Sequence, residues 1–131
     1  MNLSKEKTKN DCLSIEERLN SFNEVNKTYT KEKAFEEASR CFNCKNPSCV
    51  PACPAHNNIP LFISYILKDD LEKAREVLTN TTIMPEICGR VCPFEMQCEK
   101  GCVRSKNGDS VSIGNLERYI ADHTTLKSSI N

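Results

Sequence analysis

Apolar residues recur at helical spacing along the chain, and no stretch alternates in the manner of a half-buried strand. The first helix is expected from Ser14 to about Val25, because Ser14 and Glu17 have the spacing of a capping box. One face of this helix carries three apolar residues, Ile15, Leu19 and Phe22. We expect this face to pack on the rest of the domain, with docking to a partner as the alternative.

The pattern predicts further helices, with capping residues or prolines at their starts. Pro60 and Pro85 suit the first turn of a helix, and Asp70 and Ser112 suit N-cap positions. The expected segments are 30–41, 60–68, 70–79, 85–92 and 112–123, with a turn or short helix at Cys98 and Cys102. The segments 60–68 and 70–79 predict an αα-hairpin.

The fold class expected from this pattern is all-α, an irregular helical domain with long cysteine-bearing loops. Residues 41–53 are punctuated by prolines, which forbid a continuous helix there. We expect an N-terminal extension over residues 1–29, whose polar first twelve residues are loose, a helical domain over 30–126 and a tail over 127–131.

Composition narrows the function classes. In 131 residues, 18 basic side chains balance 18 acidic ones, so the chain lacks the basic excess of a nucleic-acid binder. No apolar stretch is long enough to cross a membrane, and the N-terminus does not have the pattern of a secretion signal. We therefore expect a cytoplasmic protein with neither nucleic acid nor membrane as partner.

The chain contains nine cysteines, an unusually high number for 131 residues. An odd count in a reducing compartment argues against a disulfide framework and favours thiolates bound to metal. Eight of them form two groups, Cys41-x2-Cys44-x4-Cys49-x3-Cys53-Pro54 and Cys88-x3-Cys92-x5-Cys98-x3-Cys102.

The spacing of these groups is typical of a protein with two [4Fe–4S] clusters. In two-cluster ferredoxins three close cysteines hold one cluster, and the cysteine before proline serves the other. By that logic Cys102 completes the first cluster and Cys53 begins the second. The alternative is a zinc-stabilised interaction module that uses the same thiolates. The x5 interval between Cys92 and Cys98 fits zinc knuckles poorly.

Other polar residues near the cysteines receive ordinary interpretations. His56 is expected to be a loop residue, Cys12 to be a non-ligand, and His123 to cap the last helix or face solvent. Six basic residues lie beside the cysteines and, taken together, would offset the negative charge of two clusters; each taken singly is expected to be a surface charge. They are Arg40, Lys45, Arg90, Lys100, Arg104 and Lys106.

Several of these segments together resemble one family, the N-terminal two-cluster Fe–S domain of the glutamate synthase small subunit, which also occurs in dihydropyrimidine dehydrogenase. The resemblance covers about residues 30–125. It is carried by Glu37-Ala38-Ser39-Arg40-Cys41-Phe42-Asn43-Cys44, Cys53-Pro54, Ile59-Pro60-Leu61-Phe62-Ile63, Ile87-Cys88-Gly89-Arg90-Val91-Cys92-Pro93, Gln97-Cys98-Glu99, Cys102 and Ile113-Gly114-Asn115-Leu116-Glu117-Arg118.

The resemblance implies an α-helical domain with two low-potential clusters that relay electrons to or from a flavin. It implies that one cluster is held by Cys41, Cys44, Cys49 and Cys102 and the other by Cys53, Cys92, Cys98 and Glu117. The residues alone leave Cys88 open as the fourth ligand of the second cluster, because Cys88 and Cys92 share a helix face.

Relatives of this kind continue into FAD- and NAD(P)-binding domains. None of the four glycines here forms the G-x-G-x-x-G fingerprint of such a domain. We therefore expect two [4Fe–4S] clusters as cofactors, with FAD and NAD(P) on a separate flavoprotein subunit, and a second redox subunit as a further partner. The expected role is electron transfer without substrate chemistry, as a free-standing subunit or a fragment of an oxidoreductase.

Overall fold

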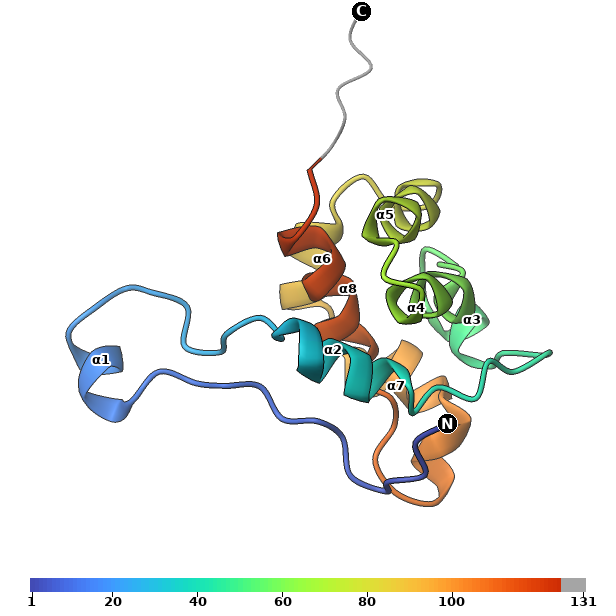
Figure 1. The fold of residues 1–131 in the computed structure, drawn as a ribbon, viewed down its shortest axis with the longest axis horizontal. Coiled ribbons are helices and arrows are strands. Elements are labelled where there is room, and N and C mark those ends of the chain that lie inside the picture. Colours follow the sequence, from blue (N-terminus) through green and yellow to red (C-terminus); the bar gives the residue numbers. More distant parts are fainter. Residues whose placement is uncertain (126–131) are drawn as a thin grey trace, which may run out of the picture.

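The computed structural model describes residues 1–125, which form an all-α fold as predicted (Figure 1). Residue 126 and the tail predicted for 127–131 lie outside the described residues. Within the described part, the single β-type pairing is an isolated bridge between Cys12 and Asn26. In chain order the elements are α1 (Ile15–Leu19), α2 (Lys31–Ala38), α3 (Cys49–Ala52), α4 (Ile59–Leu67), α5 (Leu71–Thr79), α6 (Pro85–Val91), η1 (Phe94–Met96), α7 (Cys98–Gly101), η2 (Val103–Lys106) and α8 (Ile113–Asp122).

The hydrophobic core lies between α2, α4, α5 and α8. Thr30 caps α2 by accepting a hydrogen bond from the Lys33 amide, and Asp70 caps α5 through the Lys73 amide. Helices α4 and α5 pack as the predicted αα-hairpin. The core side chains include Tyr29, Ala34, Ala38, Phe62, Ile63, Ile66, Ala74, Leu78, Leu116 and Ile120.

Two local expectations differ from the structure. The segment that begins at Cys49 forms one helical turn although it contains Pro51, because proline is tolerated in the first turn, where its missing N–H needs no partner. Ser112 precedes α8 as expected, but its hydroxyl accepts a hydrogen bond from the Asn115 amide group instead of capping the backbone.

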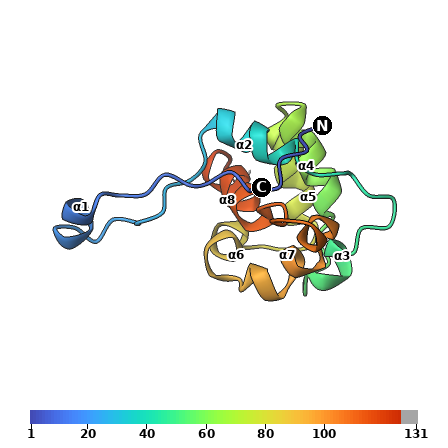
Figure 2. The ribbon, with the colours of Figure 1, turned by 90° about the horizontal axis from the view of Figure 1, so that it is seen from below.

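Residues 10–27 form a projecting arm that contacts α6 and α8 through Glu24, and α1 lies at its tip, away from the other helices (Figures 1 and 2). Ser14 caps α1 as predicted, but the helix ends at Leu19 and not near Val25. The predicted packing of its apolar face is wrong: the exposed fractions of Leu19 and Phe22 are 80% and 110%. Backbone pairing at the arm's base, such as that of the Leu13 amide with the Val25 carbonyl, holds the chain away from the core.

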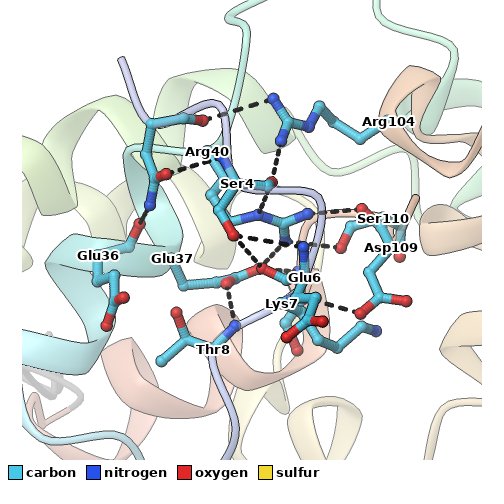
Figure 3. A network of polar contacts seen from close by, with 12 residues as sticks. Ser4, Glu6, Lys7, Thr8, Glu36, Glu37, Arg40, Arg104, Asp109 and Ser110 are labelled. Carbon is cyan, nitrogen blue, oxygen red and sulfur yellow. Dashed lines mark hydrogen bonds and ion pairs between the residues drawn. The ribbon is translucent and has the colours of Figure 1, made fainter. Parts of the chain in front are cut away.

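Residues 2–8, which we call the N-terminal strap, lie along the domain and are not loose, contrary to the expectation from their polarity. Figure 3 shows the strap crossing Arg40 and Glu37. Arg40 Nε donates to the Ser4 carbonyl (3.1 Å), and the Thr8 amide donates to Glu37 Oε2 (2.7 Å). The strap is polar because its partners are buried polar groups of the domain.

Candidate metal centres

A first cavity, of about 120 Å³, lies between the loop after α2, the start of α3 and the end of α7. Four predicted ligands line it: Cys41, Cys44, Cys49 and Cys102. The apolar part of the wall comes largely from α4 and from residues 111–113, where α8 begins. It includes Ile59, Pro60, Ile63, Val111 and Ile113.

A second cavity, of about 150 Å³, lies where α6, α7 and α8 converge on the loop after α3. Five candidate ligands line it: Cys53, Cys88, Cys92, Cys98 and Glu117. Each cavity therefore takes cysteines from both halves of the chain, as the crossover argument predicts. Cys53 lines the second cavity although it follows the three close cysteines of the first.

Glycines let the helices that bear these cysteines approach closely. A Cβ at Gly101 would lie 2.7 Å from the Ser48 carbonyl oxygen and 2.7 Å from the Ala52 Cβ, at the contact of α3 with α7. A Cβ at Gly89 would lie 2.8 Å from the Arg118 Cα, where α6 packs on α8. Such separations leave no room for a side chain, so glycine at these positions sets the spacing of the cavity walls.

The thiols are partly or fully buried, which disfavours their charged forms. Burial raises the pKa of Cys49 to about 12 and that of Cys92 to about 11, and neighbouring thiols add to both effects. Burial also raises the pKa values of Cys41 and Cys98. A bound cation would reverse this preference, because metal ligation requires the thiolate and releases the proton.

Glu117 is the most unusual group in the second cavity. Its Oε1 is buried and has no hydrogen-bond partner, and burial raises the pKa of this carboxyl to about 7. An unpartnered buried polar atom is rare in folded proteins and indicates a missing partner such as an ion. Cys88 differs, because its sulfur lies 3.6 Å from the Thr82 hydroxyl.

Comparison with known proteins assigns the family. A family model described as dihydropyrimidine dehydrogenase domain II, 4Fe-4S cluster, matches residues 18–129. The chain belongs to this 4Fe-4S family. The resemblance found in the sequence is thereby confirmed.

The relatives are longer oxidoreductase chains. The chain is 43% identical over 108 residues to the glutamate synthase [NADPH] small chain of Azospirillum brasilense and 37% identical over 105 residues to that of Halomonas elongata. It is 34% identical over 103 residues to the NAD-dependent dihydropyrimidine dehydrogenase subunit PreT of Escherichia coli. These matches cover 79–81% of the chain and 22–25% of each relative, so the chain spans about a quarter of their length or less.

The residues that line the cavities fit the iron–sulfur group that the family implies. Thiolate sulfur suits such clusters, and each cavity is roughly ten times the ~10–15 Å³ that one water molecule needs. Among residues 1–125, no three His, Cys, Asp or Glu side chains are arranged to hold a single metal ion. The donors instead surround two cavities, and the orphaned oxygen of Glu117 faces one of them.

Three further candidate residues lie apart from the cavity walls. Cys12 is on the arm, where its thiol donates to Asn26 Oδ1 (3.0 Å). His56 is an exposed loop residue with a positive φ of 53°. His123 follows α8, and its ring lies against that of Tyr119 in a tilted arrangement, with 4.4 Å between the centroids.

The interpretation of the basic residues needs a correction. Lys45, Arg90, Lys100 and Lys106 are exposed, as expected, but Arg40 and Arg104 are buried. Arg40 forms an ion pair with Glu37, 2.6 Å between Nη1 and Oε1, with both side chains fully buried. The i,i+3 spacing of Glu37 in α2 and Arg40, two residues after that helix, is compatible with such a pair, but the sequence does not reveal that other segments cover it.

Sequence reasoning also missed two residues of the second cavity, Phe94 and Asn57. A Cβ at Gly114 would meet the Phe94 ring at 2.3 Å, so this glycine makes room for the aromatic side chain. The buried Asn57 accepts a hydrogen bond from the Thr81 hydroxyl.

No helix within residues 1–125 is long and apolar enough to cross a bilayer.

Proposed function

We propose that the chain is an electron-transfer module that carries two [4Fe–4S] clusters and relays electrons to or from a separate FAD- and NAD(P)-binding flavoprotein. One observation carries the proposal: two distinct cavities, each lined by four or more candidate ligands, in a chain of the 4Fe-4S family. Every cysteine of the two sequence groups lines one of these cavities.

In the first cavity the proposed ligands are Cys41, Cys44, Cys49 and Cys102. In the second they are Cys53, Cys92, Cys98 and Glu117, with Cys88 as the alternative fourth ligand. The unpartnered Oε1 supports Glu117, because a bound iron would satisfy it. The Thr82 contact already satisfies the Cys88 thiol in part.

The clusters, when bound, supply one-electron redox chemistry. The chain's residues hold them, deprotonate to do so, and exclude water with apolar walls such as Ile59 and Ile63 beside the first cavity. Burial disfavours the free thiolates and the free carboxylate alike, and a cationic iron core bound in the cavities would offset that cost.

The names of the relatives support a link to nicotinamide-dependent oxidoreductases. Two are NADPH-dependent glutamate synthase small chains and one is a subunit of an NAD-dependent dehydrogenase. A module of this family therefore operates in chains that use nicotinamide cofactors, and we assign the flavin and nicotinamide sites to a partner flavoprotein. A second redox subunit and a cytoplasmic location belong to the same proposal.

The test is anaerobic purification followed by iron, sulfide and zinc analysis. Two clusters require about eight iron and eight sulfide per chain. Cys102→Ser is expected to impair one cluster, and Cys12→Ser, the matched control on the arm, is expected to retain both. A colourless, folded protein that contains zinc and lacks sulfide would refute the proposal.

A further inference from the structure

Arg104 is a buried cation on the wall of the first cavity. It belongs to η2, two residues after Cys102, and its exposed fraction is 8%. It lines the cavity together with the four cysteines. Its guanidinium carbon lies 4.6 Å from the centre of the Phe42 ring, which also lines the cavity.

The N-terminal strap fixes this side chain in place. Arg104 donates to the carbonyls of Ser4 and Asn2, the latter at 3.4 Å, and Figure 3 shows its guanidinium directed at the strap. These acceptors are neutral. Within the described residues Arg104 forms no ion pair, whereas Arg40, beside it under the same strap, has Glu37.

A buried arginine without a carboxylate partner is costly, because desolvation of the charge is not repaid. An anion in the adjoining cavity would repay it. Four thiolates around an iron–sulfur core provide such an anion, and one-electron reduction adds one further negative charge to it.

The second cavity has the opposite electrostatic character. None of the described residues that line it is lysine or arginine. Its one candidate ligand with an ionisable oxygen is the acidic residue Glu117. The two cavities therefore differ in the charge that their walls supply, although both have apolar surroundings.

We propose that Arg104 tunes the cluster held by Cys41, Cys44, Cys49 and Cys102, so that it accepts an electron at a higher reduction potential than the cluster in the second cavity. This inference rests on the proposed function. The reduced cluster is stabilised by a fixed positive charge that the second cavity lacks, since charge and burial are among the factors that set cluster potentials. The strap acts as the clamp that keeps this charge at the cavity wall.

The experiment is film voltammetry of the full chain, loaded anaerobically, with the electrode as the source of electrons. The wild type is expected to show two one-electron steps. Arg104→Gln is expected to lower the higher step by at least 59 mV, a tenfold change in the one-electron equilibrium constant, and to leave the lower step in place. Lys45→Gln, which removes an exposed charge beside Cys44, is the matched control and is expected to move neither step.

Two further measurements cover the case in which Arg104→Gln does not retain its clusters. Arg104→Lys keeps the charge and is expected to preserve the order of the two steps. In the wild type, the gap between the steps is expected to persist from about 0.05 M to about 1 M salt, because a buried charge is screened weakly.

The outcomes separate the two proposals. A chain without sulfide refutes the proposed function. If the chain carries both clusters, the role of Arg104 alone is refuted when Arg104→Gln leaves the higher step unmoved or shifts both steps equally. Loss of the order in Arg104→Lys, or of the gap at high salt, also refutes it.

Discussion

Glu37 joins three parts of the molecule through one carboxylate, and its closest partner is Arg40. Besides the ion pair with Arg40, Glu37 Oε1 accepts the Ser112 amide at 2.9 Å, and Oε2 accepts the Thr8 amide at 2.7 Å. Helix α2, the residue before α8 and the strap therefore meet at a single buried anion. Arg40 in turn donates to the Ser110 carbonyl at 3.0 Å.

Glu37→Gln is expected to destabilise the fold strongly. The substitution leaves the fully buried guanidinium of Arg40 without its counter-charge, a change that costs roughly 3–5 kcal/mol in buried pairs. Denaturant unfolding of the anaerobic protein measures the loss. The matched control is Asp69→Asn, which breaks the exposed Lys31–Asp69 pair and is expected to change stability little. Equal effects of the two substitutions would contradict this account.

Phe22 at the arm is expected to tolerate substitution although it is a large apolar residue. Its side chain is fully exposed, so Phe22→Ala removes no packing, and we expect a change within about 0.5 kcal/mol. Phe62 in α4 is the buried counterpart, with an exposed fraction of 0%, and Phe62→Ala is expected to cost about 3–5 kcal/mol. Thermal unfolding of both variants gives the comparison. A large loss for Phe22→Ala would show that the arm packs on the domain.

The attachment of the arm to α6 and α8 is expected to weaken in acid. A hydrogen bond from Arg90 lowers the pKa of Glu24 below 4.5, and Arg118 Nη2 also contacts Glu24 Oε2 at 3.0 Å. Because the folded-state pKa lies below the unfolded one, this contribution is complete above the ordinary pKa and is lost as pH falls through the lowered value. The pair is exposed, so solvent screening keeps the contribution below about 1 kcal/mol.

The measurement is the stability difference between the wild type and Glu24→Gln as a function of pH. We expect a positive difference near neutral pH that vanishes in acid. Glu16→Gln, another substitution of a carboxylate by an amide on the arm, serves as the control. A difference that grows as the pH falls would reverse the sign of the effect.

The choice between Glu117 and Cys88 can be decided by spectroscopy. Glu117→Ala is expected to alter the electron paramagnetic resonance of one reduced cluster and leave the other intact, because a hard oxygen ligand is replaced. Cys88→Ala is expected to preserve both signals. If Cys88→Ala changes one signal and Glu117→Ala changes none, the assignment is reversed.

Local chemistry made several elements predictable. Ser14 and Asp70 cap helices where expected, and Pro60 and Pro85 lie in the first turns of α4 and α6. These signals act over a few residues, so the sequence displays them directly. The same holds for the close spacing of the cysteines. Which thiols share a cluster was predicted from the crossover analogy and the resemblance. The structure places the two predicted sets of cysteines on the walls of two separate cavities, and the ligand assignment itself stays a prediction.

Contacts between residues far apart in the sequence could not be predicted from the hydrophobic and polar pattern. Arg104 and Arg40 were each predicted to be surface charges, but the strap covers both. Ser4 of the strap is 100 residues from Arg104 and 36 residues from Arg40 in the sequence, so no local pattern shows the contact. The apolar face of α1 was predicted to pack on the domain, because helical periodicity shows that a helix is amphipathic but not whether another element lies beside it. A short helix at the end of a paired arm has no surface within reach to bury it.

The interleaving of the two cavities has a consequence for biosynthesis. The candidate ligands of the first cavity come from residues 41–49 and from Cys102, and those of the second come from Cys53 and from residues between 88 and 117. On the ribosome, neither compartment is finished while the C-terminal half is still in the exit tunnel. If the proposed clusters bind here, their delivery must wait until residue 117 has been synthesised, and release of the polypeptide before residue 98 would leave both cavities without a complete set of candidate ligands.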